Sequence, residues 1–224
     1  MEKVNFIFDF DSTLVKIESL DEVLALSIGQ NVEKLEKLSN LTKLGMEGKI
    51  TFKESLEQRL QLSNINKELI NIVMNKALSN FTDGINSFID NLLTYENVNV
   101  FVVSGGFVDI INPVAEKLNI DVSNVYANKF IFDGDNVCGI EDTLLLQKAG
   151  KAKIIQDLKD RGVITGKTVM VGDGYTDLET QLVGAVDEYV CFCGVVNRES
   201  VKKEAKLVAN NVAELENICL SLIK

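Results

Sequence analysis

The chain has 224 residues and a formal net charge of −10, from 33 acidic and 23 basic side chains, and it contains no histidine. The missing histidine excludes Ser-His-Asp and Cys-His catalysis, phosphohistidine relays and histidine-ligated zinc or haem. The acidic balance disfavours general binding to nucleic acids or to anionic membranes, because both require a basic surface.

Four cysteines are spread along the chain without a repeated pattern, which is typical of a reduced, cytosolic protein. Cys191 and Cys193 form a C-x-C pair with no second pair to complete a zinc site, and on a strand they would face the same side and pack. Residues 1–6 are not a basic segment before a long apolar stretch, and no run approaches about 18 apolar residues. We therefore expect a cytoplasmic protein without a signal peptide or a transmembrane helix.

The first predicted strand is the apolar run of residues 4–8, and a long segment of different character follows it. Residues 15–80 contain no convincing strand, and their apolar residues recur at helical spacing. Segments 19–22 and 51–54 both have the Ser/Thr-x-x-Glu spacing of a capping box. This region is predicted to be a helical insert placed directly after the first strand.

The remainder of the chain alternates between short apolar runs and helical patterns. Continuous apolar runs of this length are typical of strands covered on both faces, as in parallel sheets. Further strands are predicted at residues 98–103, 168–171 and 189–192, helices at 85–93, 154–158 and 212–222, and a hairpin at 129–140 with Asp133-Gly134 at its turn. The alternation predicts an α/β fold with a mainly parallel sheet.

Two carboxylates, Asp9 and Asp11, follow the first predicted strand. In open α/β sheets, ligands bind at the carboxyl ends of strands. A turn at this point would spread both side chains around one centre, where one carboxylate can act as a nucleophile and the other as an acid and base. Taken alone, the D-x-D pattern is also typical of a loop with two solvated acids.

Three further motifs lie where a predicted strand ends or a predicted helix begins. Segment 172–177 brings two acids and two glycines together, and Mg²⁺ prefers such oxygen ligands. Ser104, followed by two glycines, offers a hydroxyl and backbone N–H groups at a helix N-terminus, which favour phosphate. Lys151 supplies a positive charge. In isolation these are equally an ordinary turn, a strand-to-helix turn and a solvated lysine.

Together, the four motifs supply a nucleophile, an acid and base, two groups that neutralise phosphate charge, and a metal site. Phosphoryl transfer through an aspartyl-phosphate has these requirements, because positioning and charge neutralisation provide most of its catalysis. The chemistry runs on carboxylates, a hydroxyl, a lysine and a metal, so it does not need histidine.

The order and spacing of these motifs resembles the haloacid dehalogenase superfamily of phosphatases, and in detail its members that hydrolyse O-phospho-L-serine. The resemblance covers nearly the whole chain. It rests on residues 8–13, 18, 20–22, 103–107, 117–120, 124–128, 150–151, 171–174 and 176–177. It implies a Rossmann-like parallel-sheet core, formed by residues 1–14 and 80–224, with a helical cap, residues 15–79, inserted after the first strand.

The resemblance also implies a role for each acidic residue. Asp9 would attack phosphorus and become the aspartyl-phosphate. Asp11 would protonate the leaving oxygen and then activate the hydrolytic water. Mg²⁺ would be held by Asp9, the backbone carbonyl of Asp11, and Asp173, while Asp177 would support the metal or Lys151.

Several residues are implied to bind the phosphoryl group. Ser104, the N–H group of Gly105, and Lys151 would contact its oxygens. Thr176 stands where many members of the superfamily carry asparagine, and either side chain can donate a hydrogen bond. Segment 194–195 reads Gly-Val where Gly-Asn is common, so the contact of that loop with substrate stays open.

The helical cap is implied to recognise the rest of the substrate. Glu18 would bind the substrate ammonium, and Arg59 would bind its carboxylate as a bidentate fork. Met46 and Phe52 would line the pocket. The alternatives are a first-turn helix acid for Glu18, a surface helix residue for Arg59, and cap core for the two apolar residues. Arg198 is expected to be a surface helix residue.

The resemblance implies a Mg²⁺-dependent enzyme that converts O-phospho-L-serine to L-serine and phosphate. Its partner would be a small phosphomonoester, with neither nucleic acid nor membrane, and its oligomeric state does not follow from the sequence. One alternative is a capped phosphatase for another small phosphomonoester. A second is a phospho-accepting signalling module, but the second acid of the D-x-D motif and the helical insert favour fast turnover in a closed site.

Overall fold

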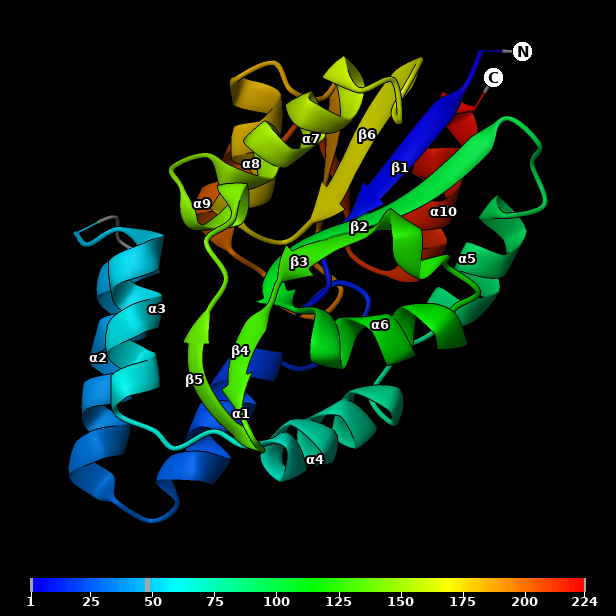
Figure 1. Ribbon diagram of the computed structural model, residues 1–224. Helices are drawn as coiled ribbons and strands as arrows, with labels where there is room; N and C mark the ends of the chain where they lie inside the picture. The colour runs from blue at the N-terminus through cyan, green and yellow to red at the C-terminus, as the bar shows by residue number, and fades with distance from the viewer. Residues whose placement is uncertain (1, 47–48, 224) are drawn as a thin grey trace.

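The computed structural model describes residues 2–46 and 49–223, without the side chains of Lys43, Gly45 and Met46. Its central strand, β1 (Val4–Phe8), is buried at all five residues, because strands flank both of its edges and helices cover both faces of the sheet. Within the described residues the main sheet has six parallel strands in the order β3-β2-β1-β6-β7-β8 (Figure 1). The other strands are β2 (Val98–Phe107), β3 (Val125–Asn128), β6 (Lys167–Gly172), β7 (Glu188–Phe192) and β8 (Leu207–Ala209).

The core consists of two hydrophobic clusters, one on each face of the sheet, and alternate side chains of β1 contribute to each. Phe6 and Phe8 pack on one face with α5 (Ile85–Leu92), α6 (Val108–Lys117) and α10 (Val212–Leu222). Ile7 packs on the other face with α7 (Gly150–Asp160), α8 (Tyr175–Leu182) and α9 (Glu199–Glu204). This three-layer arrangement confirms the predicted α/β class with a Rossmann-like parallel sheet (Figure 1).

The segment after β1 is helical, as predicted. Its helices are α1 (Ser19–Ile28), α2 (Val32–Met46), α3 (Phe52–Gln61) and α4 (Lys67–Leu78). Helices α2 and α3 pack together and stand away from the sheet, whereas α4 packs on α6 (Figure 1). The division of the chain into a core and a cap at residues 15 and 79 stays a prediction. Among the described helices, none has both the length and the apolar character that a membrane crossing requires.

Only one of the two predicted capping boxes forms. Thr51 accepts a hydrogen bond from Glu54 N at 3.1 Å, and Thr51 N donates to Glu54 Oε2 at 2.9 Å, so the capping box of α3 is confirmed. The box predicted at residues 19–22 is wrong. Ser19 is the first helical residue of α1 rather than its N-cap, and its backbone N–H and hydroxyl both bond to Asp11.

The predicted hairpin is present as β4 (Phe130–Asp133) and β5 (Asn136–Ile140), and Gly134 adopts a φ of 59° in its turn. Val137 N donates to Ile65 O at 2.9 Å, so the hairpin lies beside the connection between α3 and α4. Short 3₁₀ turns at Val122–Asn124 and Leu144–Leu146 precede β3 and α7.

The cysteine interpretation is confirmed in part. Cys191 is buried in the sheet, and its Sγ atom lies 3.7 Å from that of Cys193, so the two side chains share one face as predicted. The four cysteines are free thiols within the described part of the chain.

Candidate active site

The carboxyl ends of three neighbouring strands bring the predicted motifs together. In the sheet register, Phe8 of β1 lies opposite Val102 of β2 and Val171 of β6. The residues that follow these positions therefore meet at one edge: Asp9 after β1, the serine-glycine segment late in β2, and Asp173 after β6. Asp9 N donates to Val171 O at 2.9 Å, which holds the turn after β1 against β6.

Asp11 lies in a buried turn directly after Asp9. Ser12 adopts a φ of 54°, so the chain turns sharply directly after Asp11. Asp11 Oδ1 accepts from Ser19 N and Oδ2 accepts from Ser19 Oγ, both at 3.0 Å. Burial, followed by the charge of Glu18, raises the pKa of Asp11 well above its ordinary value. A carboxyl group that retains its proton in this way is suited to acid and base catalysis.

Lys151 is buried between two carboxylates. Its Nζ atom lies 2.8 Å from Asp9 Oδ1 and 2.6 Å from Asp177 Oδ1. Burial lowers the pKa of Lys151, but the attraction of Asp177 and Asp9 more than offsets this, so the net pKa is raised and the ammonium stays charged. Lys151 is therefore a fixed positive charge beside the predicted nucleophile, and the alternative of a solvated helix lysine is wrong.

Carboxylate oxygens of Asp9, Asp173 and Asp177 lie within 4.8 Å of one another. Burial raises the pKa of Asp173, and the neighbouring charge of Asp9 raises it further. Burial also raises the pKa of Asp177, although Lys151 opposes this. Clustered, partly desolvated oxygen donors are the ligand set that Mg²⁺ prefers, so these residues fit a divalent cation. The role of the backbone carbonyl of Asp11 as a ligand of Mg²⁺ stays a prediction.

Gly172 allows the approach of Asp177 to this cluster. A Cβ atom at Gly172 would lie 2.3 Å from Asp177 Oδ2, a distance that no side chain tolerates. Asp177 is also fixed by Gly174 N, which donates to Oδ2 at 3.0 Å. The Gly-Asp-Gly pattern thus serves packing as well as turning, because the first glycine makes room for the carboxylate that pairs with Lys151.

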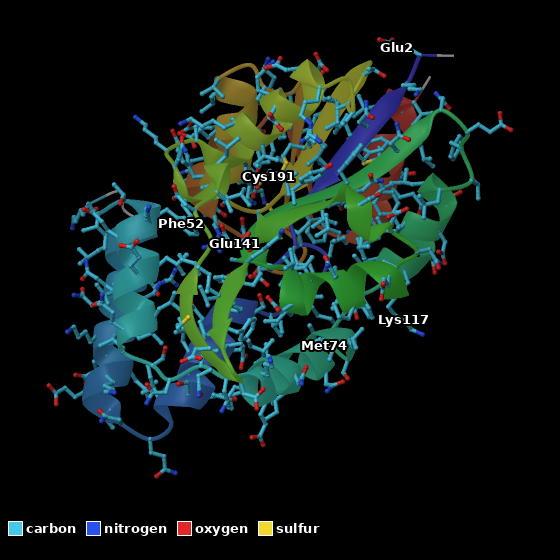
Figure 2. All side chains as sticks on the ribbon, in the orientation of Figure 1. Glu2, Phe52, Met74, Lys117, Glu141 and Cys191 are labelled. Atoms are coloured by element: carbon cyan, nitrogen blue, oxygen red, sulfur yellow. The ribbon has the colours of Figure 1, made fainter. Side chains whose placement is uncertain are left out.

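The serine-glycine segment of β2 carries the predicted phosphate-binding groups. Ser104 is buried, and its Oγ atom accepts a hydrogen bond from Gly106 N at 3.1 Å. Phe52, at the start of α3, lies over Gly105: its ring is 3.4 Å from the position that a Cβ atom at Gly105 would take. Figure 2 shows Phe52 at the end of α3 nearest the core. The structure therefore brings Phe52 to the serine-glycine segment, and its role as a wall of the substrate pocket stays a prediction.

Glu18 faces the acidic cluster from the beginning of α1. Its Oε1 atom accepts from Ser12 Oγ at 2.7 Å and lies 3.5 Å from Arg198 Nη2. Burial raises the pKa of Glu18. Glu18 is the N-cap residue of α1 without a side-chain capping bond, so the alternative of an acid in the first turn of the helix is not what the structure shows.

Arg59 is buried in α3 with 7% of its surface exposed, so the alternative of a surface helix residue is wrong. Nη1 donates to Asp21 Oδ1 at 2.9 Å, and Nε finds no hydrogen-bond partner among the residues that the structure describes.

Two further predicted substrate-binding residues are placed less closely. Met46 was predicted to line the pocket, but its side chain lies outside the described part of the chain. Thr176 is exposed on the first turn of α8.

Two neighbours of the candidate site were not recognised from the sequence. Arg198 is the N-cap residue of α9, and its Nε atom donates to Asp173 Oδ2 at 2.7 Å, so its assignment to a helix surface is wrong. The only usable sequence feature was its place after β7, at the carboxyl edge of the sheet. Asn128, at the end of β3, donates to Gly105 O at 2.8 Å, although its match to the superfamily carried no role.

The loop at segment 194–195 is shaped by apolar packing. A Cβ atom at Gly194 would lie 2.4 Å from Phe192 Cζ, so the ring of Phe192 occupies the space beside the glycine. Val195 packs against the larger hydrophobic cluster. The departure from Gly-Asn therefore gives this loop an apolar contact in place of a polar side chain.

Comparison with known proteins matches this chain to a family. The chain fits the model of the haloacid dehalogenase-like hydrolase family over residues 6–180. It is 35% identical over 210 residues to phosphoserine phosphatase of Homo sapiens, with 93% of this chain and 89% of that protein covered. A phosphoserine phosphohydrolase-like protein from Francisella tularensis has a TM-score of 0.84 and 32% identity over 97% of this chain and 99% of its own.

A further structure is described as a phospho-aspartyl intermediate analogue of phosphoserine phosphatase. It matches with a TM-score of 0.79 and 28% identity over 97% of this chain and 99% of its own. The family match begins within β1 and ends within α8, and the similarity to the human protein covers 93% of the chain. The chain therefore belongs to the haloacid dehalogenase-like hydrolase family.

Proposed function

We propose that this chain is a Mg²⁺-dependent phosphoserine phosphatase, which hydrolyses O-phospho-L-serine to L-serine and phosphate through an aspartyl-phosphate on Asp9. The observation that carries the proposal is the buried arrangement of Lys151 between Asp9 and Asp177, beside Asp173. This arrangement supports a mechanism in which a nucleophile, a fixed positive charge and a set of metal ligands act at one point. A cytoplasmic location, expected from the sparse cysteines, stays a prediction.

In the first step, Asp9 attacks phosphorus. Oδ1 of Asp9 is held by Phe10 N at 2.7 Å and by Lys151 Nζ, which leaves Oδ2 to form the new bond. The bond between phosphorus and the serine oxygen breaks, and Asp11 gives its proton to that oxygen. The raised pKa of Asp11 supports this role, because an alkoxide is a poor leaving group without an acid.

In the second step, Asp11 has become a carboxylate and accepts a proton from a water molecule. The water oxygen attacks phosphorus, the bond to Asp9 breaks, and phosphate is released. Ser104, Gly105 N–H and Lys151 would hold the phosphoryl oxygens during both steps, with Thr176 as a further donor.

Asp9 and Asp173 would hold the divalent cation, together with the carbonyl of Asp11, and Asp177 would orient Lys151. A bound cation supplies neutralisation of the phosphoryl charge. The close approach of the carboxylates of Asp9, Asp173 and Asp177 supports this assignment, because their mutual repulsion calls for a counter-charge.

Recognition of a zwitterionic substrate rests on Glu18 and Arg59. Ser12 Oγ donates a hydrogen bond to the Glu18 carboxylate and holds it near the acidic cluster of Asp9, Asp173 and Asp177. In this position Glu18 can pair with the substrate ammonium. A buried guanidinium is costly unless its donors are paired. The Nε donor of Arg59 has no partner among the described residues, and a substrate carboxylate would supply the missing acceptor. Phe52 and Met46 would form the apolar wall.

A phosphate-release assay over a panel of phosphomonoesters, with and without Mg²⁺, tests the proposal. We expect phosphoserine to give the highest kcat/KM and chelation to remove turnover, because both the cation and the zwitterion contacts would be needed. A clear preference for a phosphomonoester without an amino acid group would favour the alternative substrate class. A phosphorylated protein that persists for minutes would favour the signalling module.

Arg59→Lys separates recognition of the substrate carboxylate from chemistry. The variant keeps a positive charge but loses the planar fork, so we expect KM for phosphoserine to rise about tenfold with little change in kcat. Phosphoethanolamine retains the ammonium and the phosphate but lacks the carboxylate, and its KM should stay within about twofold. The matched control is Arg161→Lys, because Arg161 is exposed and forms an ion pair with Asp157. An equal rise of KM for both substrates would contradict the carboxylate role.

A further inference from the structure

The phosphate-binding segment of β2 is a bulge opposite β3. Val103 pairs with Tyr126 and Phe107 pairs with Asn128, so three residues on β2 stand against one on β3 between these pairs. The two extra residues interrupt the regular ladder of hydrogen bonds at Ser104, Gly105 and Gly106. Backbone groups freed in this way are available for a ligand, but they also need something to fix their directions.

The side chain of Asn128 supplies a hydrogen bond to β2 where the backbone ladder is interrupted. Its side chain is fully buried, and Nδ2 donates to Gly105 O at 2.8 Å. Its Oδ1 atom accepts from Thr143 Oγ1 at 3.0 Å, so the amide is held from both ends. Thr143 immediately precedes the 3₁₀ turn that packs against the beginning of α7, where Lys151 lies.

The hydrogen bond from Asn128 to Gly105 O orients a whole peptide unit rather than a single carbonyl oxygen. The carbonyl of Gly105 and the N–H group of Gly106 belong to one planar, trans peptide unit and point in opposite directions. At the far end of this unit, Gly106 N donates to Ser104 Oγ at 3.1 Å. Because Ser104 Oγ accepts that hydrogen bond, its own proton is free to be donated elsewhere.

We propose that Asn128 is a positioning residue that sets the donor direction of the Ser104 hydroxyl through the peptide unit between Gly105 and Gly106. The chain of donors runs from Thr143 to Asn128, from Asn128 to the Gly105 carbonyl, from Gly106 N–H to Ser104, and from Ser104 to a phosphoryl oxygen. The inference rests on the proposed function, in which Ser104 binds phosphate.

A double-mutant cycle on the Mg²⁺-loaded enzyme tests this relay, with inorganic phosphate as the probe. Asn128→Ala should raise the inhibition constant of phosphate about tenfold when Ser104 is present. In a Ser104→Ala background the same change should alter it by less than about twofold, because the residue then has nothing to orient. Thr143→Val keeps the side-chain shape and should give the same pattern with an effect of about threefold, which preserves the test if Asn128→Ala does not fold.

Asn124→Ala is the matched control. Its Nδ2 atom donates to Val100 O at 3.1 Å, which is also a side-chain amide bonded to a carbonyl of β2 but lies before the bulge. We expect it to lower Tm and to leave the phosphate inhibition constant unchanged. An equal effect of Asn128→Ala and Thr143→Val with and without Ser104 would overturn the relay. If Ser104→Ala itself changed neither turnover nor phosphate inhibition, the placement of phosphate at Ser104 would be wrong, and the relay with it.

Discussion

Asp9→Asn is expected to lower kcat for phosphoserine by at least about four orders of magnitude while the protein stays folded. An amide oxygen does not attack phosphorus, so the covalent path is closed. The shape of the side chain is retained, and Oδ1 can still accept from Phe10 N and Lys151. The measurement is phosphate release at saturating substrate, together with a test for acid-stable labelling of the protein by radioactive phosphoserine.

The control for this change is Asp157→Asn on α7, where the carboxylate is exposed and pairs with Arg161 at 3.0 Å. It should leave kcat within about twofold of the unmodified enzyme. Turnover by Asp9→Asn above about one per cent of the original, after correction for deamidation back to aspartate, would remove Asp9 as the nucleophile. It would point to attack by water while Asp9 only held the cation.

The central strands were predictable because a strand buried on both faces is encoded by a continuous run of mainly apolar residues. A strand covered on both faces is mostly apolar, and β1 and β6 each show a short apolar run, with Asn5 as the polar exception inside β1. Strands β3 and β8 were missed because they are short, with four and three residues, and lie at the edges of the sheet. Their pairing is a property of tertiary structure rather than of local pattern.

The motifs of the candidate site could be recognised from their positions at strand ends and helix starts, whereas the contacts that support them could not. Arg198 reaches Asp173 only because the loop after β7 folds back over the carboxyl edge of the sheet. Ser19 has the spacing of a capping residue, but its backbone N–H and hydroxyl both bond to Asp11, a contact across the turn after β1 that the local pattern could not reveal. Periodicity within α3 could not reveal that Arg59 points towards Asp21 of α1, since that contact joins two helices.

Replacing Lys151 by methionine is expected to reduce stability and activity together. Methionine keeps an unbranched apolar stem in a side chain that is 7% exposed, so packing changes little. The ammonium is lost, and the carboxylates of Asp9 and Asp177 are left buried without their shared counter-charge. Breaking a buried pair in this way costs about 3–5 kcal/mol of unfolding free energy. Urea unfolding of the chelated protein measures this cost, and phosphate release measures turnover.

The matched control is Lys153→Met, two residues further along α7. Its ammonium is exposed and donates to Gln147 Oε1 at 2.7 Å, so the change should stay within about 0.5 kcal/mol and leave turnover unaffected. Equal stability of Lys151→Met and the unmodified protein would contradict the buried ion pair. Retained turnover would contradict the role of Lys151 in phosphate binding.

The two replacements also separate two contributions to catalysis. Asp9→Asn removes the covalent path but keeps the ion pair of Lys151 with Asp177, so it should affect turnover and spare stability. Lys151→Met keeps the nucleophile but removes the charge that organises both carboxylates, so it should affect both quantities. If turnover in Lys151→Met recovered at high Mg²⁺ concentration while stability without metal stayed low, the lysine would contribute to catalysis mainly by holding the metal ligands in place. Without such recovery, its direct neutralisation of the phosphoryl charge would be the larger contribution.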